Sequence, residues 1–133
     1  MIYVTDTHPL IFQATNREER LGKRARRVYR DAESGKHAII VPIVVLEETA
    51  RLIEKRVVEL VTPFRLWAEE LDRSPNYRIQ AYTIGILLEA TALRGIRDPA
   101  DRVIVATARH LGYPLITADG IIRDGRWVET IWD

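Results

Sequence analysis

The segment Ala38-Ile39-Ile40-Val41-Pro42 decides the fold. Its four apolar residues follow one another without a polar residue between them, and such a run is typical of a strand that is buried on both faces, as in a parallel sheet. Pro42 has the fixed φ that suits the first turn of a helix, so we expect a helix from Pro42 to about Arg56. A strand followed at once by a helix predicts an α/β fold.

The same alternation of strands and helices continues in both directions along the chain. Toward the N-terminus, residues 2–5 form a β-prone run, and a short helical segment is expected over residues 10–13. Toward the C-terminus we expect helices over 18–33, 63–71, 84–93 and 99–111, strands over 77–82, 113–117 and 127–132, and a turn over 120–125. The pattern predicts a single α/β domain over residues 1–133, in which helices flank a central, mainly parallel β-sheet.

The composition is that of an ordinary globular protein, with 47% hydrophobic and 29% charged residues among 133. The absence of cysteine excludes disulfides and thiolate metal sites. Any metal must therefore be held by oxygen or imidazole. The longest apolar run, residues 38–46, is far shorter than the about 20 residues that span a bilayer, and residues 1–4 do not resemble a secretion signal. We expect a cytoplasmic protein that does not contact a membrane.

Several acidic residues lie where open α/β sheets bind their ligands. Asp6 and Asp119 each follow an apolar strand, Glu47 lies near the start of a helix that follows another strand, and Asp101 opens the helix before the fourth strand. If these strands are neighbours, the carboxylates converge at one edge of the sheet. Each acid also has a structural interpretation, because aspartates at strand ends frequently cap the next helix.

Either Glu47 or Glu48 could be the acid at the start of this helix. The apolar stripe of their helix is expected to consist of Leu46, Ala50, Ile53 and Val57. At about 100° per residue, Glu47 then lies at the edge of the stripe and Glu48 points away into solvent. A helical wheel therefore favours Glu47 as the buried acid, although Arg51 could form an ion pair with it across one helical turn.

The segment Asp98-Pro99-Ala100-Asp101 allows two interpretations. An aspartate at N-cap, a proline at N1 and an acid at N3 together fit the start of a helix, and this capping explains both acids without any chemistry. Alternatively, one or both carboxylates bind metal. Carboxylates that gather without lysine or arginine repel one another and require a cation, for which Mg²⁺ or Mn²⁺ are the usual choices. Such sites favour metal-assisted attack of water on a phosphodiester.

The arginines between Arg17 and Arg30 form a basic segment in a chain whose net charge is only +1. A basic helix can follow phosphates, or it can simply be the solvated face of a helix. Arg20, Arg24 and Arg27 are the candidates for contacts with RNA or with a protein partner.

Four motifs in order resemble those of the PIN domain, and more narrowly those of VapC-type toxin ribonucleases whose first motif reads Asp-Thr-His. The motifs are Val4-Thr5-Asp6-Thr7-His8, Val41-Pro42 leading to Glu47, Arg97-Asp98-Pro99-Ala100-Asp101-Arg102 with Ala106-Thr107-Ala108, and Leu115-Ile116-Thr117-Ala118-Asp119. The family has a parallel α/β sheet, in agreement with the pattern of elements. Ala100 and Pro42 depart from residues common in the family, and neither departure removes an acid.

The resemblance implies a Mg²⁺-dependent endoribonuclease that is the toxin of a type II toxin–antitoxin system, with Mn²⁺ as an alternative ion. It implies a small antitoxin as partner, RNA as substrate and a homodimer. The implied acidic quartet is Asp6, Glu47, Asp101 and Asp119, with Asp98 as an additional acid, Thr117 as a supporting hydroxyl, and Thr7 and His8 as weaker candidates. Asp98 is well explained as the helix cap, so Asp101 is the better candidate for the metal.

Two rival functions share this sequence pattern. One is a PIN-like module that binds RNA or protein without cleaving it, and the other is a PIN nuclease of DNA or of ribosomal RNA processing. His37 and His110 have no second histidine at ligand spacing, so no zinc site is expected.

Overall fold

The fold is built around one sheet of five parallel strands, and a computed structural model describes it for residues 1–133. The strands lie side by side in the order β3-β2-β1-β4-β5. They are β1 (Ile2–Thr5), β2 (Ala38–Pro42), β3 (Tyr77–Gln80), β4 (Leu115–Ile116) and β5 (Thr130–Ile131). Every pairing is parallel, and Val4 of β1 lies between Ile40 of β2 and Leu115 of β4. The predicted α/β fold with a parallel sheet is confirmed.

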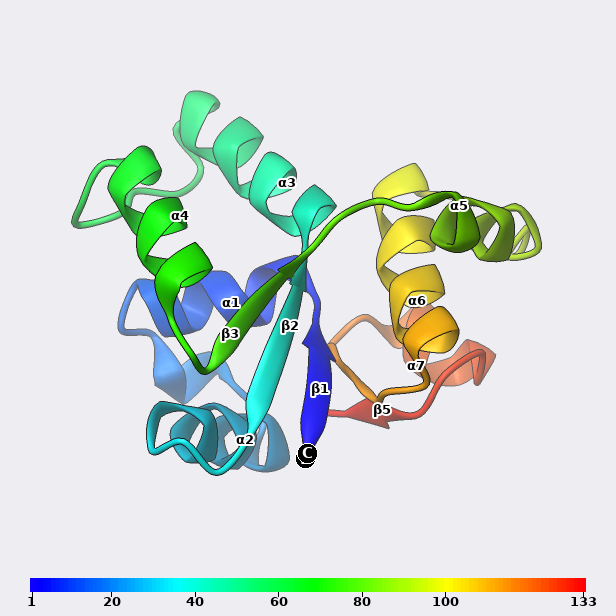
Figure 1. Cartoon of the computed structure of the whole chain (residues 1–133), viewed down its shortest axis with the longest axis horizontal. Coiled ribbons are helices and arrows are strands. Elements are labelled where there is room, and N and C mark those ends of the chain that lie inside the picture. The colour runs from blue at the N-terminus through cyan, green and yellow to red at the C-terminus, as the bar shows by residue number, and fades with distance from the viewer.

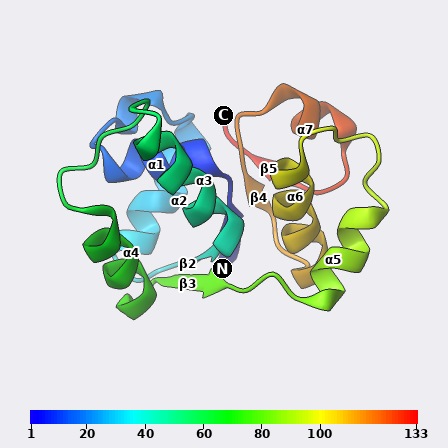
Figure 2. The ribbon, with the colours of Figure 1, turned by 90° about the horizontal axis from the view of Figure 1, so that it is seen from above.

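Seven α-helices and one short 3₁₀ helix, η1, connect the strands. They are α1 (Thr7–Ala14), η1 (Glu18–Arg20), α2 (Lys23–Glu33), α3 (Ile43–Glu54), α4 (Phe64–Arg73), α5 (Ile84–Thr91), α6 (Pro99–Leu111) and α7 (Gly120–Gly125). Seen from above, α1 to α4 gather on one side of the molecule and α5 to α7 on the other (Figure 2). None of these helices has the length and apolar character needed to cross a bilayer.

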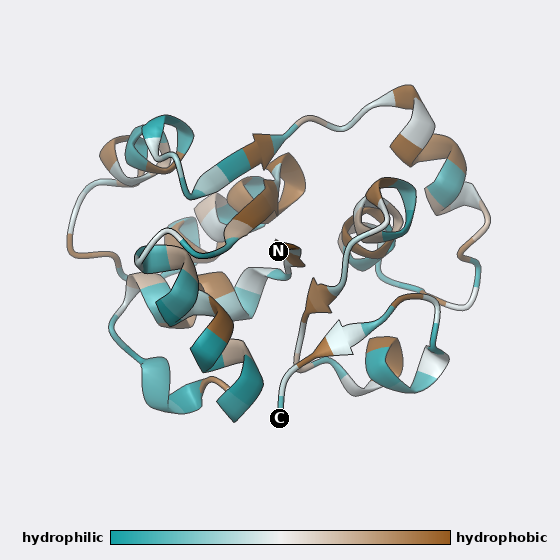
Figure 3. Ribbon diagram, turned by 60° about the horizontal axis from the view of Figure 1, so that its bottom comes forward, coloured by the Kyte–Doolittle hydropathy of each residue, from teal (hydrophilic) through white to brown (hydrophobic).

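The core lies between the sheet and the helices that cover it. The β2 residues Ile39 and Val41 are fully buried, as their uninterrupted apolar run predicts. Helix α6 is the most buried helix, because every residue from Val103 to Ala108 is buried. It ends at Gly112, whose φ of 79° lies in the left-handed region that glycine adopts without strain. In Figure 3 the helices carry both brown and teal segments, as expected for elements with one buried face.

Two elements differ in kind from the sequence-based expectation, and the strands expected over 77–82, 113–117 and 127–132 are shorter in the structure. The helix expected over residues 18–33 is divided into η1 and α2 at Gly22, where a Cβ atom would lie 2.2 Å from the carbonyl oxygen of Trp132. The C-terminal segment therefore packs against the backbone at this glycine, and Ala25 donates its amide hydrogen to the same carbonyl at 3.1 Å. The turn expected over residues 120–125 is the short helix α7. Asp119 caps this helix, because its side chain accepts a hydrogen bond from the Ile122 amide.

The position of β1 determines where ligands can bind. Its neighbours are β2 on one side and β4 on the other. The sheet therefore grows from β1 through β2 and β3 on one side, and through β4 and β5 on the other. In α/β sheets the crevice outside such a switch point is the usual ligand site. In Figure 1 the first turns of α3 and α6 lie at the upper end of the sheet, where β1 and β2 end.

Candidate functional site

Asp6 is the most firmly held acid of the site. It is only 8% exposed and follows directly after β1, where it caps α1. One carboxylate oxygen accepts a hydrogen bond from the Thr7 amide at 2.8 Å, and the other accepts one from the Thr117 hydroxyl at 2.7 Å. Burial raises the pKa of Asp6, while these two hydrogen bonds oppose the rise. The carboxylate therefore has a fixed direction.

Thr117 connects Asp6 to the next acid along the edge of the sheet. It is fully buried at the end of β4, and its hydroxyl oxygen accepts a hydrogen bond from the Asp119 amide at 3.1 Å. Asp119 is half-buried and accepts a bond from the Ile122 amide at 3.1 Å, so it also caps α7. The Thr117 hydroxyl thus donates to the Asp6 carboxylate and accepts from the backbone of Asp119, and its support of a metal site stays a prediction.

Asp98 and Asp101 have the separate positions that the sequence suggests. Asp98 is exposed and caps α6, accepting a hydrogen bond from the Asp101 amide at 3.0 Å. The Asp101 carboxylate makes no return bond to the Asp98 backbone, so only half of a capping box forms. Asp101 is half-buried and its carboxylate is left free to face the other acids.

Glu48, and not Glu47, lies close to Asp101 and the other aspartates, so the helical-wheel prediction for this pair is wrong. The Thr7 hydroxyl donates a hydrogen bond to Glu48, whereas Glu47 is 66% exposed and lies 3.7 Å from Arg51. The helix buries Val45, Leu46 and Thr49. Measured from Val45 and Thr49, at about 100° per residue, Glu47 points to the opposite side.

Thr49 is the reason for the error. Its hydroxyl donates to the Val45 carbonyl one turn back at 2.8 Å, so a polar residue lies at the centre of the buried stripe. A stripe of apolar residues alone misses it. Val57, which was assigned to the stripe, lies beyond the end of α3 and is 69% exposed. Counting Thr49 as a buried position would have placed Glu48 at the core boundary.

None of the clustered acids forms an ion pair with a lysine, an arginine or a histidine. The ion pairs of the protein involve other carboxylates, namely those of Asp31, Glu47, Glu69, Glu89 and Asp133. Burial, followed in order of effect by the negative charges of Asp6, Asp98, Asp119 and Glu48, raises the pKa of Asp101 to about 7. These five residues are called the acidic cluster below. At neutral pH the cluster holds excess negative charge, which a proton or a cation can offset.

The chemistry of the acidic cluster fits a hard divalent cation. All of its ligand atoms are carboxylate or hydroxyl oxygens, which Mg²⁺ and Mn²⁺ prefer. No three acidic or imidazole groups are already arranged as a compact metal cage. Mg²⁺ usually retains several waters and takes only one or two carboxylates directly, so such a cage is not required.

A groove that begins at His8, whose charge acts on Asp6, is lined by several arginines. It has a volume of about 640 Å³, and apolar residues and arginines line it together with His8. His8 is exposed, its ring lies 6.3 Å from that of Phe12, and its charge lowers the pKa of Asp6. Arg20 reaches the same groove, with its guanidinium 5.8 Å from the Phe12 ring centre. Arg24 and Arg27 do not line it and are exposed on α2.

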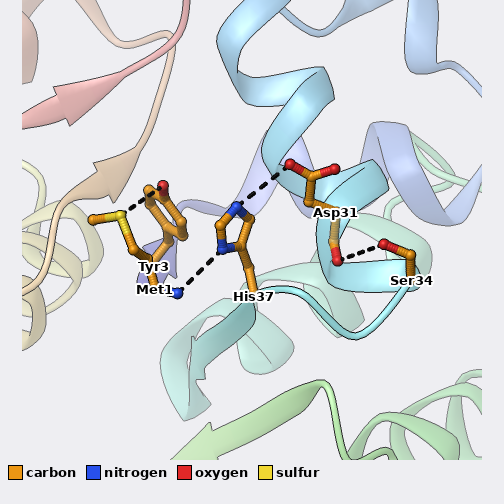
Figure 4. A network of polar contacts seen from close by, with 5 residues as sticks. All are labelled: Met1, Tyr3, Asp31, Ser34 and His37. Atoms are coloured by element: carbon orange, nitrogen blue, oxygen red, sulfur yellow. Dashed lines mark hydrogen bonds and ion pairs between the residues drawn. The ribbon is translucent and has the colours of Figure 1, made fainter.

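The other two histidines lie away from this groove. Figure 4 shows the surroundings of His37, whose Nε2 lies 3.5 Å from Asp31 and whose Nδ1 lies 3.2 Å from the Met1 amino group. Tyr3 packs edge-on against the His37 ring at 5.3 Å. His110 is exposed near the end of α6.

The family model described as "PIN domain" matches residues 3–127. The chain belongs to the PIN domain family. This PIN domain chain is also 34% identical over 89 residues to Ribonuclease VapC22 of Mycobacterium tuberculosis, an alignment that covers 64% of this chain and 67% of the relative. The resemblance to VapC-type PIN proteins is thereby confirmed.

Solved structures of low sequence identity share the fold of this PIN domain. The crystal structure of VapBC2 from Rickettsia felis bound to a promoter DNA fragment contains a chain with a TM-score of 0.70 and 16% identity, and the match covers 100% of both chains. FitAcB from Neisseria gonorrhoeae matches with a TM-score of 0.64 and 17% identity over 98% of this chain and 96% of that one. At these identities the similarity demonstrates a common fold.

Proposed function

We propose that this PIN domain protein is a Mg²⁺-dependent endoribonuclease and the toxin of a type II toxin–antitoxin pair. The acidic cluster carries the proposal, because it gathers unpaired carboxylates at the switch point of the sheet, where burial and the neighbouring acids together raise the pKa of Asp101 to about 7. The similarity to a protein named as a VapC ribonuclease supports RNA as the substrate. Residues 1–133 act as one nuclease domain, and Mn²⁺ can replace Mg²⁺.

Asp6, Glu48, Asp101 and Asp119 are the proposed ion-binding acids, so Glu48 replaces Glu47 in the predicted quartet. Asp6 cannot turn away from the site, because the Thr117 hydroxyl and the Thr7 amide hold both of its oxygens. Thr7 also donates its hydroxyl to Glu48, which draws α3 toward the end of β1. Asp98 acts mainly as the cap that orients the first turn of α6 and therefore Asp101.

The substrate phosphate is an anion, and without a cation the acidic cluster repels it. Bound Mg²⁺ would offset this charge, act as a Lewis acid toward the phosphate and make a water molecule more acidic. Asp101 has a pKa of about 7 in the ion-free protein, so it can hold a proton at the site near neutral pH. His8 at the rim and Arg20 in the adjoining groove face the path by which RNA reaches the acids.

The groove beside His8 also suits a small antitoxin. Apolar residues from α1 and from the segment after α3 line it, and Arg17, Arg20 and Arg56 border it with positive charge. A partner segment with apolar and acidic side chains would match both properties and would block the approach to the acidic cluster. The protein structures with the same fold are described as VapBC and FitAB assemblies, which is consistent with such a partner.

Helix α5 provides the surface for a homodimer. Ile84, Leu87 and Leu88 are 71%, 42% and 62% exposed, and Tyr82 precedes them with 46% exposure. Contiguous apolar side chains of this kind are typical of a protein interface. A second copy of the same chain would bury them symmetrically.

The experiment measures cleavage of a labelled single-stranded RNA by the purified protein with Mg²⁺ and with chelator. We expect cleavage with Mg²⁺ only, loss of cleavage in Asp101→Asn, and substantial activity in Asp98→Asn, since asparagine retains the helix cap. RNA binding without cleavage by the wild type would favour the non-cleaving module. Cleavage of DNA but not RNA would favour the other PIN nuclease. Full activity in both variants would exclude this assignment of the site.

A further inference from the structure

Tyr29 of α2 is connected to Asp6 of the acidic cluster by hydrogen bonds. The phenol is completely buried, and its oxygen lies 2.5 Å from the hydroxyl oxygen of Thr5 at the end of β1. Thr5 in turn donates its only hydroxyl hydrogen to the backbone carbonyl of Asp6 at 3.0 Å. Since this hydrogen is used, Tyr29 must be the donor in its bond with Thr5. The result is a relay from the Tyr29 hydroxyl through Thr5 to the Asp6 carbonyl.

The hydroxyl of Tyr29 is not needed for packing. The other buried residues of α2 are Ala25, Val28 and Ala32, which fill the core without polar atoms. A phenylalanine at position 29 would fill the same volume, whereas a buried hydroxyl requires a partner to offset the loss of water. Burial raises the pKa of Tyr29, and the charge of Asp6 is one of the causes, so the phenol lies within electrostatic reach of the site.

The relay completes the set of bonds that fix Asp6. The Asp6 amide donates to the Ile116 carbonyl at 2.9 Å, and Thr7 and Thr117 hold its carboxylate. The bond from Thr5 is the remaining one, and it fixes the carbonyl. A residue whose amide, carbonyl and carboxylate are all bonded cannot rotate its carboxylate without breaking one of these bonds.

We infer that Tyr29 is a positioning residue for the divalent-cation site: through Thr5 it fixes the backbone of Asp6 and hence the direction of the Asp6 carboxylate. The inference rests on the proposed function, in which Asp6 binds Mg²⁺. It adds a residue from α2, a helix that contributes no acid to the cluster. Residues that orient metal ligands in this indirect way typically affect metal affinity by about 10- to 100-fold.

Tyr77 of β3 provides a matched control. It is also a buried tyrosine, with 8% exposure, and its hydroxyl donates to the Glu33 carboxylate at 3.0 Å. Burial and the charges of Tyr29 and Glu33 raise its pKa, and no acid of the cluster is among the causes. Tyr77→Phe therefore removes one buried hydroxyl and one hydrogen bond, as Tyr29→Phe does, without touching Asp6.

The test is a calorimetric titration of the purified full chain with Mg²⁺, in the absence of RNA, for the wild type, Tyr29→Phe and Tyr77→Phe. We expect Tyr29→Phe to bind Mg²⁺ roughly tenfold more weakly and Tyr77→Phe to match the wild type within about twofold. Thermal unfolding in chelator should show a similar loss of stability in both variants. RNA cleavage by Tyr29→Phe should recover when the Mg²⁺ concentration is raised, because a weaker site can still be filled.

Thr5→Val breaks the relay at its middle and keeps the shape of the side chain. It should weaken Mg²⁺ binding at least as much as Tyr29→Phe, and the double variant should be no weaker than Thr5→Val alone, because both changes interrupt one relay. Wild-type affinity in Tyr29→Phe, or an equal loss in Tyr77→Phe, would overturn the inference while leaving the proposed function intact. A wild-type protein that binds no Mg²⁺ would overturn both.

Discussion

Asp101→Asn is expected to stabilise the ion-free protein while it abolishes cleavage. The pKa of Asp101 rises from its ordinary value of 3.8 to about 7 because burial and four neighbouring acids disfavour its charged form. Each tenfold change in acidity is worth about 1.4 kcal/mol. The charged Asp101 therefore lowers the free energy of unfolding by at most about 4 kcal/mol at pH 8, and Asp101→Asn removes this loss. Asp101 is only half-buried, so solvent screening reduces the expected gain to about 2 kcal/mol. For a chain of this size the gain is roughly 5–8 °C in Tm.

The sign of the pH dependence follows from proton binding. Between about pH 4 and pH 7 the folded protein keeps a proton on Asp101 that the unfolded chain has released, so stability falls as the pH rises through this range. The advantage of Asp101→Asn should therefore be less than half as large at pH 5 as at pH 8. Thermal unfolding in chelator at both pH values measures it. Glu47→Gln is the control, because Glu47 is exposed and lies outside the cluster. A destabilised Asp101→Asn at pH 8, or an equal gain in the control, would refute the reasoning.

Three further predictions concern the support of the site, the basic helix and the proposed dimer. Thr117→Val removes a hydroxyl that bonds two acids of the cluster, so calorimetry should show about tenfold weaker Mg²⁺ binding. Thr117→Ser keeps the hydroxyl and should keep the wild-type affinity for Mg²⁺. Equal affinities in the two variants would count against a supporting role of Thr117. Neutralising Arg24 and Arg27 with glutamine should lower the slope of log K for RNA against log salt by about 1.4 if both contact phosphates, and an unchanged slope would exclude α2 as the RNA path. Leu88→Asp should convert a dimer into a monomer by light scattering, and a wild-type monomer would exclude the dimer through α5.

The sequence predicted the parts of the site that depend on local pattern. The apolar run before Pro42 indicated a buried parallel strand, and Asp98 and Pro99 indicated the start of α6, because capping depends only on neighbours in sequence. Convergence of the acids required β1 to lie between β2 and β4. The sequence alone does not determine this strand order, and the structure has it.

The features that the sequence did not predict depend on contacts between distant segments. The choice between Glu47 and Glu48 required knowing that Thr49 satisfies its own hydroxyl and can be buried. The bond between Thr117 and Asp6 joins residues 111 positions apart, and the break in the helix at Gly22 comes from the approach of the C-terminal segment. No local pattern encodes such contacts, so they appear only when the chain is folded.

In the proposed mechanism, only acids that face one another at the switch point bind the ion and support cleavage, whereas acids that merely lie near it do not. The most direct test compares RNA cleavage at fixed Mg²⁺ by Glu48→Gln and by Glu47→Gln. These variants remove the same charge from adjacent positions of one helix, one within the cluster and one exposed to solvent. Loss of a direct ligand should cost at least as much as the about 100-fold upper effect of an orienting residue. We predict such a loss in Glu48→Gln and activity within about twofold of the wild type in Glu47→Gln, while equal activity in the two variants, or the reverse order, would contradict the account.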